Sequence, residues 1–305
     1  MLTKDVERYL SIRRSLGFKL ANVDLRLRSF ARVASLAGES RIRADTAIRW
    51  AAAAPSPDAR RRRIQEVAIL ARFLRAEDPA HEVPRTDLFF YRRTRPTPYI
   101  YTRQEVERLL LAASQLQPNR RTPLRREMNV MLLGLIAAAG LRLAEALHLR
   151  VDDLIPGGVL RIRHSKFSKS RLVPLHATVA SAMSRYLRLR RRVHATNDYM
   201  FPSSASGPMH PSTVHCTFRR VVRLARIAIN RGRRPRIHDL RHTFATRVLE
   251  QSHMDRRTAG EQFVALATYL GHVHPASTYW YLQATPHLMS DMAEALEALF
   301  AKEVA

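Results

Sequence analysis

The stretch AAAGLRLAEALHLRVDDL, residues 137–154, places a glycine between two segments of helical pattern. Gly140 is expected to end the first helix, because glycine readily adopts the left-handed conformation found at helix C-termini. Arg142 then stands at the head of the next helix, with Glu145 one turn further along. A cation at a helix start opposes the helix dipole, so Arg142 needs another reason to be there. A phosphate ligand is such a reason, since a guanidinium group binds phosphate oxygens in a two-pronged geometry.

The residues around this stretch predict a mostly helical domain with one small antiparallel sheet. Residues 159–164 and 171–175 form short apolar or alternating segments around the polar turn SKFSKS, which is typical of a β-hairpin. Thr102 and Glu105 have the spacing of a capping box and predict that a helix begins there. Further helices are expected at residues 123–139, 143–149, 177–192, 211–229, 238–251, 260–270 and 286–301.

The beginning of the chain predicts a separate helical domain. Apolar residues recur at helical spacing, and helices are expected at residues 3–15, 22–37, 44–53 and 58–76. A proline-rich stretch without periodicity follows and is typical of a connector. The expected organisation is a helical domain at residues 1–85, a linker at 86–101 and a larger domain at 102–305. The predicted fold class is mainly α.

The charge of the chain points to a polyanionic partner. Fifty-two Lys and Arg residues stand against 26 Asp and Glu residues, which gives a net charge of +26 and a pI near 11.5. The basic residues are spread along the chain, and a folded surface of this charge attracts nucleic acid. An arginine-favouring genome is the alternative explanation of the excess.

Cysteine content and hydropathy indicate the compartment. Cys216 is the only cysteine, which excludes an intrachain disulfide framework and a multi-cysteine zinc site and suits a reducing environment. The longest apolar stretch, around residues 130–143, is interrupted by Gly140 and Arg142, and the N-terminus lacks the apolar centre of a signal peptide. A cytoplasmic protein without a membrane span is expected.

Six polar residues of the second domain form a set whose presence is not explained by packing or solvation alone. Each one alone is typical of a packing residue or of a solvated turn. Together they supply what a metal-independent attack on a phosphodiester needs, namely cations for the phosphorane, an acid for the leaving oxygen and a covalent nucleophile. The set comprises Arg142, Lys166, His238, Arg241, His272 and Tyr281.

The segments that carry these residues resemble, in order and spacing, the motifs of the tyrosine recombinase (phage integrase) family. GLRLAEAL resembles the first arginine motif, and the Lys-x-x-Lys-x-Arg-x-x-Pro pattern at residues 166–174 resembles the β-hairpin lysine motif. His-Asp-Leu-Arg at residues 238–241 resembles the second arginine motif. Leu-Gly-His followed nine residues later by Tyr281 matches the terminal motif. The resemblance covers residues 101–288, and the first domain is similar to the core-binding (SAM-like) domain of the family.

The resemblance implies a role for each residue. Arg142 and Arg241 would clamp the scissile phosphate, and His272 would bind its other oxygen. Tyr281 would attack to form a 3′-phosphotyrosine, Lys166 would protonate the departing 5′-hydroxyl, and His238 would help to accept the tyrosine proton. Glu145 would support the site from behind. No metal, ATP or other cofactor is implied, because the phosphotyrosine conserves the energy of the broken bond.

Two features depart from the pattern. Tyr279 lies two residues before Tyr281 and competes with it for the role of nucleophile, although the spacing favours Tyr281. The segment 252–262 is longer and more charged than the usual link between the second arginine motif and the Leu-Gly-His motif.

Double-stranded DNA is the expected partner, held between the two domains as the resemblance implies. Arginine runs and a one-sided stripe on the helix expected at 211–229 are typical of phosphate contacts, although a solvated surface explains such runs equally well. The predicted DNA contacts are Arg13, Arg14, Arg60, Arg61, Arg62, Arg63, Lys169, Arg171, Arg219 and Arg223.

The last expected helix, residues 286–301, has an apolar stripe that either completes its own domain or, as in the family, docks on a neighbouring protomer. A homo-oligomer, a tetrameric synapse on DNA at the nucleoid, is therefore expected, formed alone or with related recombinases.

Three functions remain open at this point. The first is a recombinase acting as an integrase, transposase or resolvase, and the tail YLQATPHLM resembles transposon-borne members. The second is a type IB topoisomerase, which uses the same chemistry to relax supercoils; the first domain disfavours it. The third is an accessory DNA-binding protein that retains the site without using it.

Overall fold

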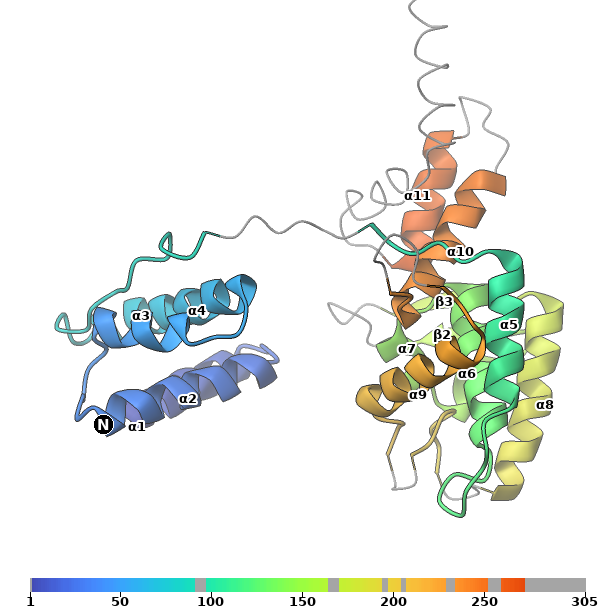
Figure 1. Cartoon of the computed structure of the whole chain (residues 1–305), viewed down its shortest axis with the longest axis horizontal. Coiled ribbons are helices and arrows are strands. Elements are labelled where there is room, and N and C mark those ends of the chain that lie inside the picture. Colours follow the sequence, from blue (N-terminus) through green and yellow to red (C-terminus); the bar gives the residue numbers. More distant parts are fainter. Residues whose placement is uncertain are drawn as a thin grey trace, which may run out of the picture. The chain divides into compact units, whose positions relative to one another are not determined.

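The computed structural model describes residues 2–90, 97–163, 170–193, 197–203, 207–228, 234–251 and 259–271. The chain divides into two compact units, residues 1–96 and 97–305, which are considered separately below (Figure 1). The expected helix at 286–301 lies outside the described residues, as does the tip of the expected hairpin. The predicted DNA-binding role of the first unit stays a prediction.

The described part of the first unit, residues 2–90, contains four helices around one apolar core. Ser56 begins the fourth helix as its N-cap, and its hydroxyl accepts a hydrogen bond from the Ala59 amide at 3.3 Å. Phe30 and Trp50 pack at 5.4 Å between ring centroids in the centre of this core. The helices are α1 (Leu2–Ser15), α2 (Ala21–Leu36), α3 (Ala44–Ala52) and α4 (Pro57–Arg75).

Alanines complete the buried face of α2. Leu27 and Phe30 are fully buried and share that face with Ala31 and Ala34. This spacing of three and four residues is that of one helical stripe. Leu36, although apolar, is 84% exposed because it lies off the stripe.

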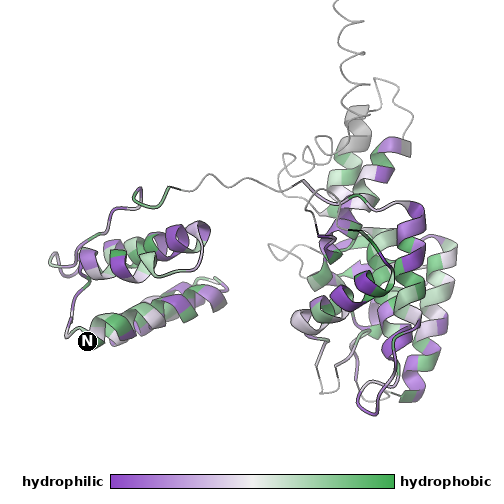
Figure 2. Ribbon diagram, viewed as in Figure 1, coloured by the Kyte–Doolittle hydropathy of each residue, from purple (hydrophilic) through white to green (hydrophobic). Residues whose placement is uncertain are grey.

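The second unit is built around a central helix, α6 (Arg125–Ala139), which packs against α5, α8 and α10. Buried side chains lie almost all the way round α6, from Met128 to Ala139, as expected of a helix enclosed by others. The other helices of the unit carry both hydrophobic and hydrophilic residues (Figure 2). They are α5 (Arg103–Ser114), α7 (Leu143–Leu147), α8 (Ala177–Val193), α9 (Pro211–Leu224), α10 (Ile237–Gln251) and α11 (Ala259–Leu270).

Two local signals position the start of α5 and the end of α6. The Thr102 hydroxyl accepts from the Glu105 amide at 3.1 Å, and the Glu105 carboxylate accepts from the Thr102 amide at 2.8 Å, which confirms the capping box. Gly140 ends α6 with a φ of 60°, in the left-handed region. The turn to α7 therefore follows directly from the glycine.

The small sheet has three antiparallel strands where two were predicted. Strands β2 (Val159–Ile162) and β3 (Arg171–Pro174) form the expected hairpin, with Ile162 opposite Arg171. The additional strand β1 (Leu154–Ile155) pairs with β2 after a short 3₁₀ turn, η1 (Val151–Asp153). Two residues are too few to show a strand period, so the pattern of the sequence alone does not reveal β1.

Helix α9 ends at Leu224, five residues before its predicted end at 229. Arg226 turns the chain with a φ of 49°, and the Ile227 amide donates to the Val222 carbonyl at 3.3 Å. Neither glycine nor proline occupies this turn, so the sequence gives no stop signal there.

The predicted fold class, mainly α with a small antiparallel sheet, is confirmed. None of the helices in the described ranges is long and apolar enough to cross a membrane. Within the same ranges, no group of three or more His, Cys, Asp or Glu side chains is arranged to hold a metal ion.

Candidate active site

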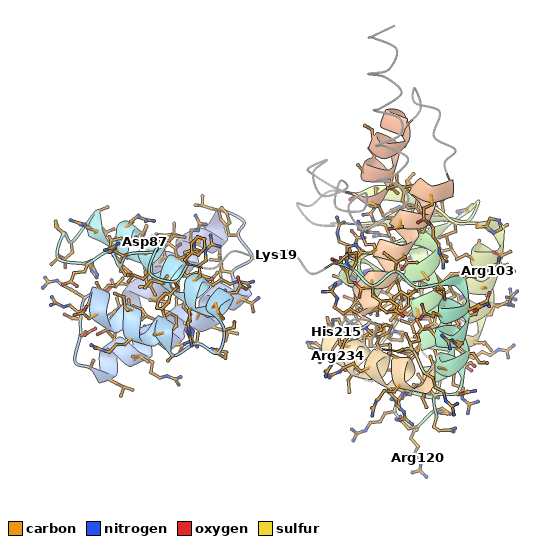
Figure 3. The ribbon with its side chains drawn as sticks, turned by 45° about the horizontal axis from the view of Figure 1, so that its top comes forward. Lys19, Asp87, Arg103, Arg120, His215 and Arg234 are labelled. Atoms are coloured by element: carbon orange, nitrogen blue, oxygen red, sulfur yellow. The ribbon has the colours of Figure 1, made fainter. Side chains whose placement is uncertain are left out.

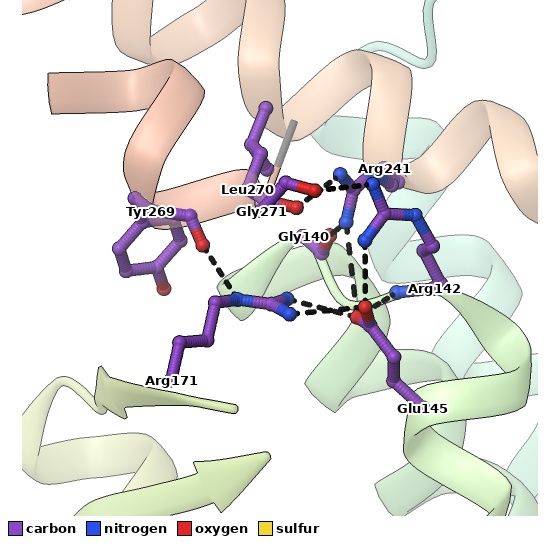
Figure 4. Close-up of polar contacts among 8 residues, drawn as sticks. All are labelled: Gly140, Arg142, Glu145, Arg171, Arg241, Tyr269, Leu270 and Gly271. Atoms are coloured by element: carbon purple, nitrogen blue, oxygen red, sulfur yellow. Dashed lines mark hydrogen bonds and ion pairs between the residues drawn. The ribbon is translucent and has the colours of Figure 1, made fainter. Parts of the chain in front are cut away.

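Three elements of the second unit bring charged side chains together at one place, and a fourth supplies backbone carbonyls that hold them. These are the turn from α6 into α7, the start of β3, the first turns of α10 and the C-terminal end of α11 (Figure 4). The residues come from parts of the sequence that are up to 129 positions apart, as the bond between Arg142 and Gly271 shows. The fold is therefore needed to assemble the cluster.

Glu145 is the centre of this cluster, and its side chain is only 4% exposed. Its carboxylate accepts from the Arg142 backbone amide at 3.0 Å and from the Arg142 guanidinium at 2.7 Å. Both carboxylate oxygens also accept from the Arg171 guanidinium, at 3.0 and 2.8 Å. Arg241 approaches one of them to 4.0 Å. Three guanidinium groups thus share one carboxylate, and the cluster keeps two net positive charges.

Arg142 begins α7 and also holds the end of α11. Its Nη2 atom donates to the Gly271 carbonyl at 2.9 Å, and about a quarter of its side chain is exposed. Gly271 has a φ of 66° and leaves room for guanidinium groups, since a Cβ there would lie 3.1 Å from Nη1 of Arg171. Arg142 is therefore the partly solvent-accessible cation of the cluster.

Arg241 is buried, with 1% of its surface exposed. Its Nη1 donates to the Gly140 carbonyl at 2.6 Å, and its Nη2 donates to the Leu270 carbonyl at 2.7 Å. These two carbonyls lie at the C-terminal ends of α6 and α11, where a cation is favourable. In this arrangement Arg241 joins two helix ends and is covered from solvent.

His238 lies three residues before Arg241 on α10, close to the same cluster. Asp239 caps the helix by accepting from the Arg236 amide at 2.9 Å, which fixes the first turn. Although the residue is exposed to solvent, the protein packed around His238 and the charge of Arg241 lower its pKa to about 4. The imidazole is therefore neutral at neutral pH and able to accept a proton.

Of the six predicted catalytic residues, the structure brings together Arg142, His238 and Arg241, along with the supporting Glu145. Lys166, His272 and Tyr281 lie outside the described residues, as do Lys169 and the competing Tyr279. Most of the unusual segment 252–262 is also outside, and α11 begins at Ala259.

The ion pairs of Glu145 predict a pH dependence of stability. Burial raises the pKa of Glu145, but the hydrogen bonds and charges of Arg171 and Arg142 outweigh burial and lower it to about 2, from an ordinary 4.5. A carboxylate with a folded pKa below its unfolded pKa stabilises the fold above pH 4.5 and loses this contribution as the pH falls toward 2. The contribution corresponds to about 3 kcal/mol.

We expect the free energy of unfolding of wild type to exceed that of Glu145→Gln at pH 7, and the difference to shrink steadily between pH 5 and pH 3. Chemical denaturation followed by circular dichroism at each pH measures it. A difference that stays constant over this range would show that the charge of Glu145 does not stabilise the fold.

The structure places Arg171 differently from the prediction of a DNA contact. Its side chain is 13% exposed, and all three guanidinium nitrogens donate to Glu145 or to the Tyr269 carbonyl. A signal was present in the sequence, because Arg171 precedes the buried Val173 by two residues on one strand and so shares its face.

The predicted contacts of the first unit are not uniformly available to DNA. Arg63 donates to the Trp50 carbonyl at 2.9 Å and stacks on the Trp50 ring, and Arg60 donates to the Ala54 carbonyl at 3.1 Å. Arg61 is half-buried, whereas Arg62 is exposed and pairs with Asp58. Of the other pair, Arg13 lies 3.8 Å from the Phe18 ring centroid and Arg14 pairs with Asp24.

Helix α9 presents its predicted arginines on one exposed face. Val214, Phe218 and Val221 are buried, while Arg219 and Arg223 lie on the outward side. His215, which Figure 3 labels, is exposed on the same helix. Arg220, Arg223 and Leu224 line a shallow surface pocket. The face is basic and open to solvent.

Comparison with known proteins identifies relatives of the whole chain. The profile described as "Phage integrase family" matches residues 100–287. The integrase/recombinase y4rB of Sinorhizobium fredii is 36% identical over 303 residues, which span 96% of each chain. The tyrosine recombinase XerD of Caulobacter vibrioides is 31% identical over 74% of this chain and 70% of its own. The fold is similar to that of the XerH site-specific recombinase bound to palindromic difH substrate, with a TM-score of 0.66 and 19% identity over 92% of this chain and 80% of that one.

Proposed function

Because this chain belongs to the phage integrase family and is a site-specific tyrosine recombinase that cleaves and rejoins DNA, we propose that Tyr281 is the nucleophile. Its oxygen attacks the scissile phosphorus, forms a 3′-phosphotyrosine and displaces the 5′-oxygen. Lys166 gives a proton to this leaving oxygen, and His238 helps to take the proton from the tyrosine. The resealing step reverses these transfers with a new 5′-hydroxyl, so that the reaction needs neither a metal nor ATP.

One observation carries this proposal, namely the gathering of three guanidinium groups on a single buried carboxylate beside a neutral histidine. Arg142, Arg171 and Arg241 exceed the charge of Glu145, so the cluster attracts an anion. A pentacoordinate phosphate carries more negative charge than the diester, and fixed cations stabilise it more than the ground state. His272 follows Gly271, whose carbonyl is held by Arg142, and we propose that it donates to a phosphate oxygen.

Arg142 and Arg241 contribute differently to binding of the scissile phosphate. Arg142 is partly exposed and can meet the phosphate from its present position. Arg241 is covered and donates to two helix-end carbonyls, so a direct contact with the phosphate requires that the atoms covering its guanidinium group move aside. We propose that substrate binding drives this movement, because a charged phosphate oxygen is a strong acceptor for a guanidinium group.

A trapping assay tests the proposed reaction. Duplexes are first selected from a random-sequence library by their binding to the protein. They are then nicked one or two nucleotides beyond the cleavage position, so that the departing fragment diffuses away and the covalent intermediate accumulates. The expected product, in excess EDTA, is a denaturation-resistant adduct that carries DNA on its 3′ phosphate.

The other two functions give other products in this assay. An accessory DNA-binding protein would bind the selected duplexes and yield no adduct. A type IB topoisomerase would relax supercoiled plasmids that lack the selected sequence. Either outcome would contradict the proposed site-specific strand exchange.

We propose that the enzyme acts on duplex DNA at the nucleoid as an oligomer, a tetramer at synapsis. The solved relatives include a XerH complex with difH substrate and a lambda integrase tetramer on a Holliday junction. The net charge of +26 supports a polyphosphate partner. Whether the reaction serves integration, excision, transposition or resolution depends on the DNA ends, and the selected duplexes would identify them.

The exposed face of α9 gives a prediction for DNA binding. We expect Arg219→Ala together with Arg223→Ala to weaken binding uniformly across sequences, because phosphate contacts carry no base information. The slope of log affinity against log salt concentration should decrease by about 2, one for each lost phosphate contact. Fluorescence anisotropy between 50 and 300 mM salt measures the slope.

A variant of equal charge serves as the control for α9. Arg185 and Arg188 are exposed on α8, and their replacement by alanine removes the same two charges from the same unit. We expect this control to change the slope much less. Equal changes of the slope in both double variants would mean that the net charge of the unit determines DNA binding and that the α9 face makes no specific phosphate contacts.

A further inference from the structure

Arg171 joins three segments of the catalytic unit at one buried point (Figure 4). It is the first residue of β3, its Nε donates to the Tyr269 carbonyl near the end of α11, and its two terminal nitrogens reach the carboxylate of Glu145 on α7. The missing side chain of Gly271 makes room for this guanidinium. The contact is therefore a built site for an arginine whose side chain is only 13% exposed.

Arg171 forms a two-pronged ion pair with Glu145, so the carboxylate does not depend on Arg142 alone for its neutralisation. A buried carboxylate needs a cation and hydrogen bonds, and removing its partner is strongly unfavourable. Arg171 meets both oxygens, at 2.8 and 3.0 Å, while the Arg142 guanidinium meets one, at 2.7 Å. Among the described residues, Glu145 without Arg171 would have only Arg142 as a close charge partner, since Arg241 stays 4.0 Å away.

We infer that Arg171 is a positioning residue that neutralises Glu145 and thereby keeps Arg142 available for the substrate phosphate. The inference rests on the proposed role of Arg142 in binding that phosphate. Arg171 itself does not touch the substrate, because its nitrogens are directed at Glu145 and Tyr269. Its loss would shift Arg142 toward the carboxylate and lower the positive charge offered to the phosphorane.

A double-mutant cycle separates this role from general support of the fold. The rate of covalent adduct formation is measured in a single turnover for wild type, Arg171→Met, Glu145→Gln and the double variant. We expect Arg171→Met to be at least about 100-fold slower than wild type, the loss typical of a misplaced charge donor. If the task of Arg171 is to neutralise Glu145, the double variant should be no slower than Glu145→Gln alone.

A neutral substrate supplies the second measurement. A methylphosphonate at the scissile position lacks the charged oxygen that Arg142 binds, so Arg171→Met should lose less than about tenfold relative to wild type on this substrate. Both substrates are cut by the same preparation, and the ratio of the two rates does not depend on the fraction of folded protein. Arg171→Lys keeps the charge without the two-pronged geometry, and its rates should lie between those of wild type and Arg171→Met.

Three results would overturn the inference. Losses that multiply in the double variant would show that Arg171 and Glu145 act independently. An equal relative loss of Arg171→Met on both substrates would assign Arg171 to the fold and not to phosphate charge. Absence of any adduct with wild type would remove the proposed function and this inference with it, whereas the first two results leave the proposed function intact.

Discussion

Replacing Tyr281 by phenylalanine is expected to abolish the covalent adduct with DNA completely. Phenylalanine keeps the ring and removes only the oxygen that would form the bond to phosphorus, so the proposed nucleophile is lost. Binding of the selected duplex should remain within about threefold of wild type, because the substitution keeps the aromatic ring and leaves the charge of the protein unchanged. Denaturing electrophoresis with a nicked duplex detects the adduct, and a mobility shift measures binding.

Tyr279→Phe is the matched control, since it removes the same atom two positions earlier. We expect this variant to form the adduct at nearly the wild-type rate, because only Tyr281 lies nine residues after His272. The opposite pattern, an adduct with Tyr281→Phe and none with Tyr279→Phe, would transfer the role of nucleophile to Tyr279. Peptide mapping of the wild-type adduct gives the same answer without substitution.

Helix ends with strong local sequence signals were predictable. Short elements and turns that only a few backbone hydrogen bonds define were not. The capping box of Thr102 and Glu105 and the stop at Gly140 place helix ends within one or two residues. By contrast, β1 consists of two residues, and the left-handed turn after α9 is made by Arg226, a residue type that does not signal such a turn. Tertiary packing decides such positions.

The site was predictable where short motifs hold neighbouring residues together. The three-residue spacings of Arg142 with Glu145 and of His238 with Arg241 each follow from one helix turn. The pairing of Arg171 with Glu145 joins positions 26 apart on a strand and a helix, and the contact of Arg241 with the Leu270 carbonyl adds a third element. No spacing in the sequence encodes these contacts, which arise when the helix ends converge.

Replacing Gly140 by alanine is expected to have the second largest effect, on stability and activity together. The left-handed φ of 60° costs a residue with a Cβ about 1 to 2 kcal/mol. The added Cβ would also lie 2.9 Å from a Phe244 ring carbon and 3.1 Å from a Leu270 methyl group, which adds about 1 to 3 kcal/mol of overpacking. The free energy of unfolding should fall by about 2 to 5 kcal/mol, measured by denaturant titration.

Activity should fall as well, because the backbone at Gly140 is part of the arginine cluster. Its carbonyl accepts from Arg241 at 2.6 Å, and the chain continues directly into Arg142. A shift of a few tenths of an ångström that relieves Phe244 would therefore move both guanidinium groups relative to the phosphate. We expect adduct formation to slow by at least about 100-fold under conditions in which the variant is still folded.

Gly157→Ala separates the backbone cost from the collision. Gly157 also has a left-handed φ, 83°, but a Cβ there would meet nothing within 4 Å, and the turn between β1 and β2 contains no group of the cluster. This control should lose about 1 to 2 kcal/mol of stability and retain its cleavage rate. Equal losses of stability in the two variants would refute the contact with Phe244. A normal cleavage rate in Gly140→Ala would show that the carbonyl of residue 140 does not set the position of Arg241. The hydrogen bonds of the Arg241 guanidinium to the ends of α6 and α11 would then tolerate a displacement of that carbonyl.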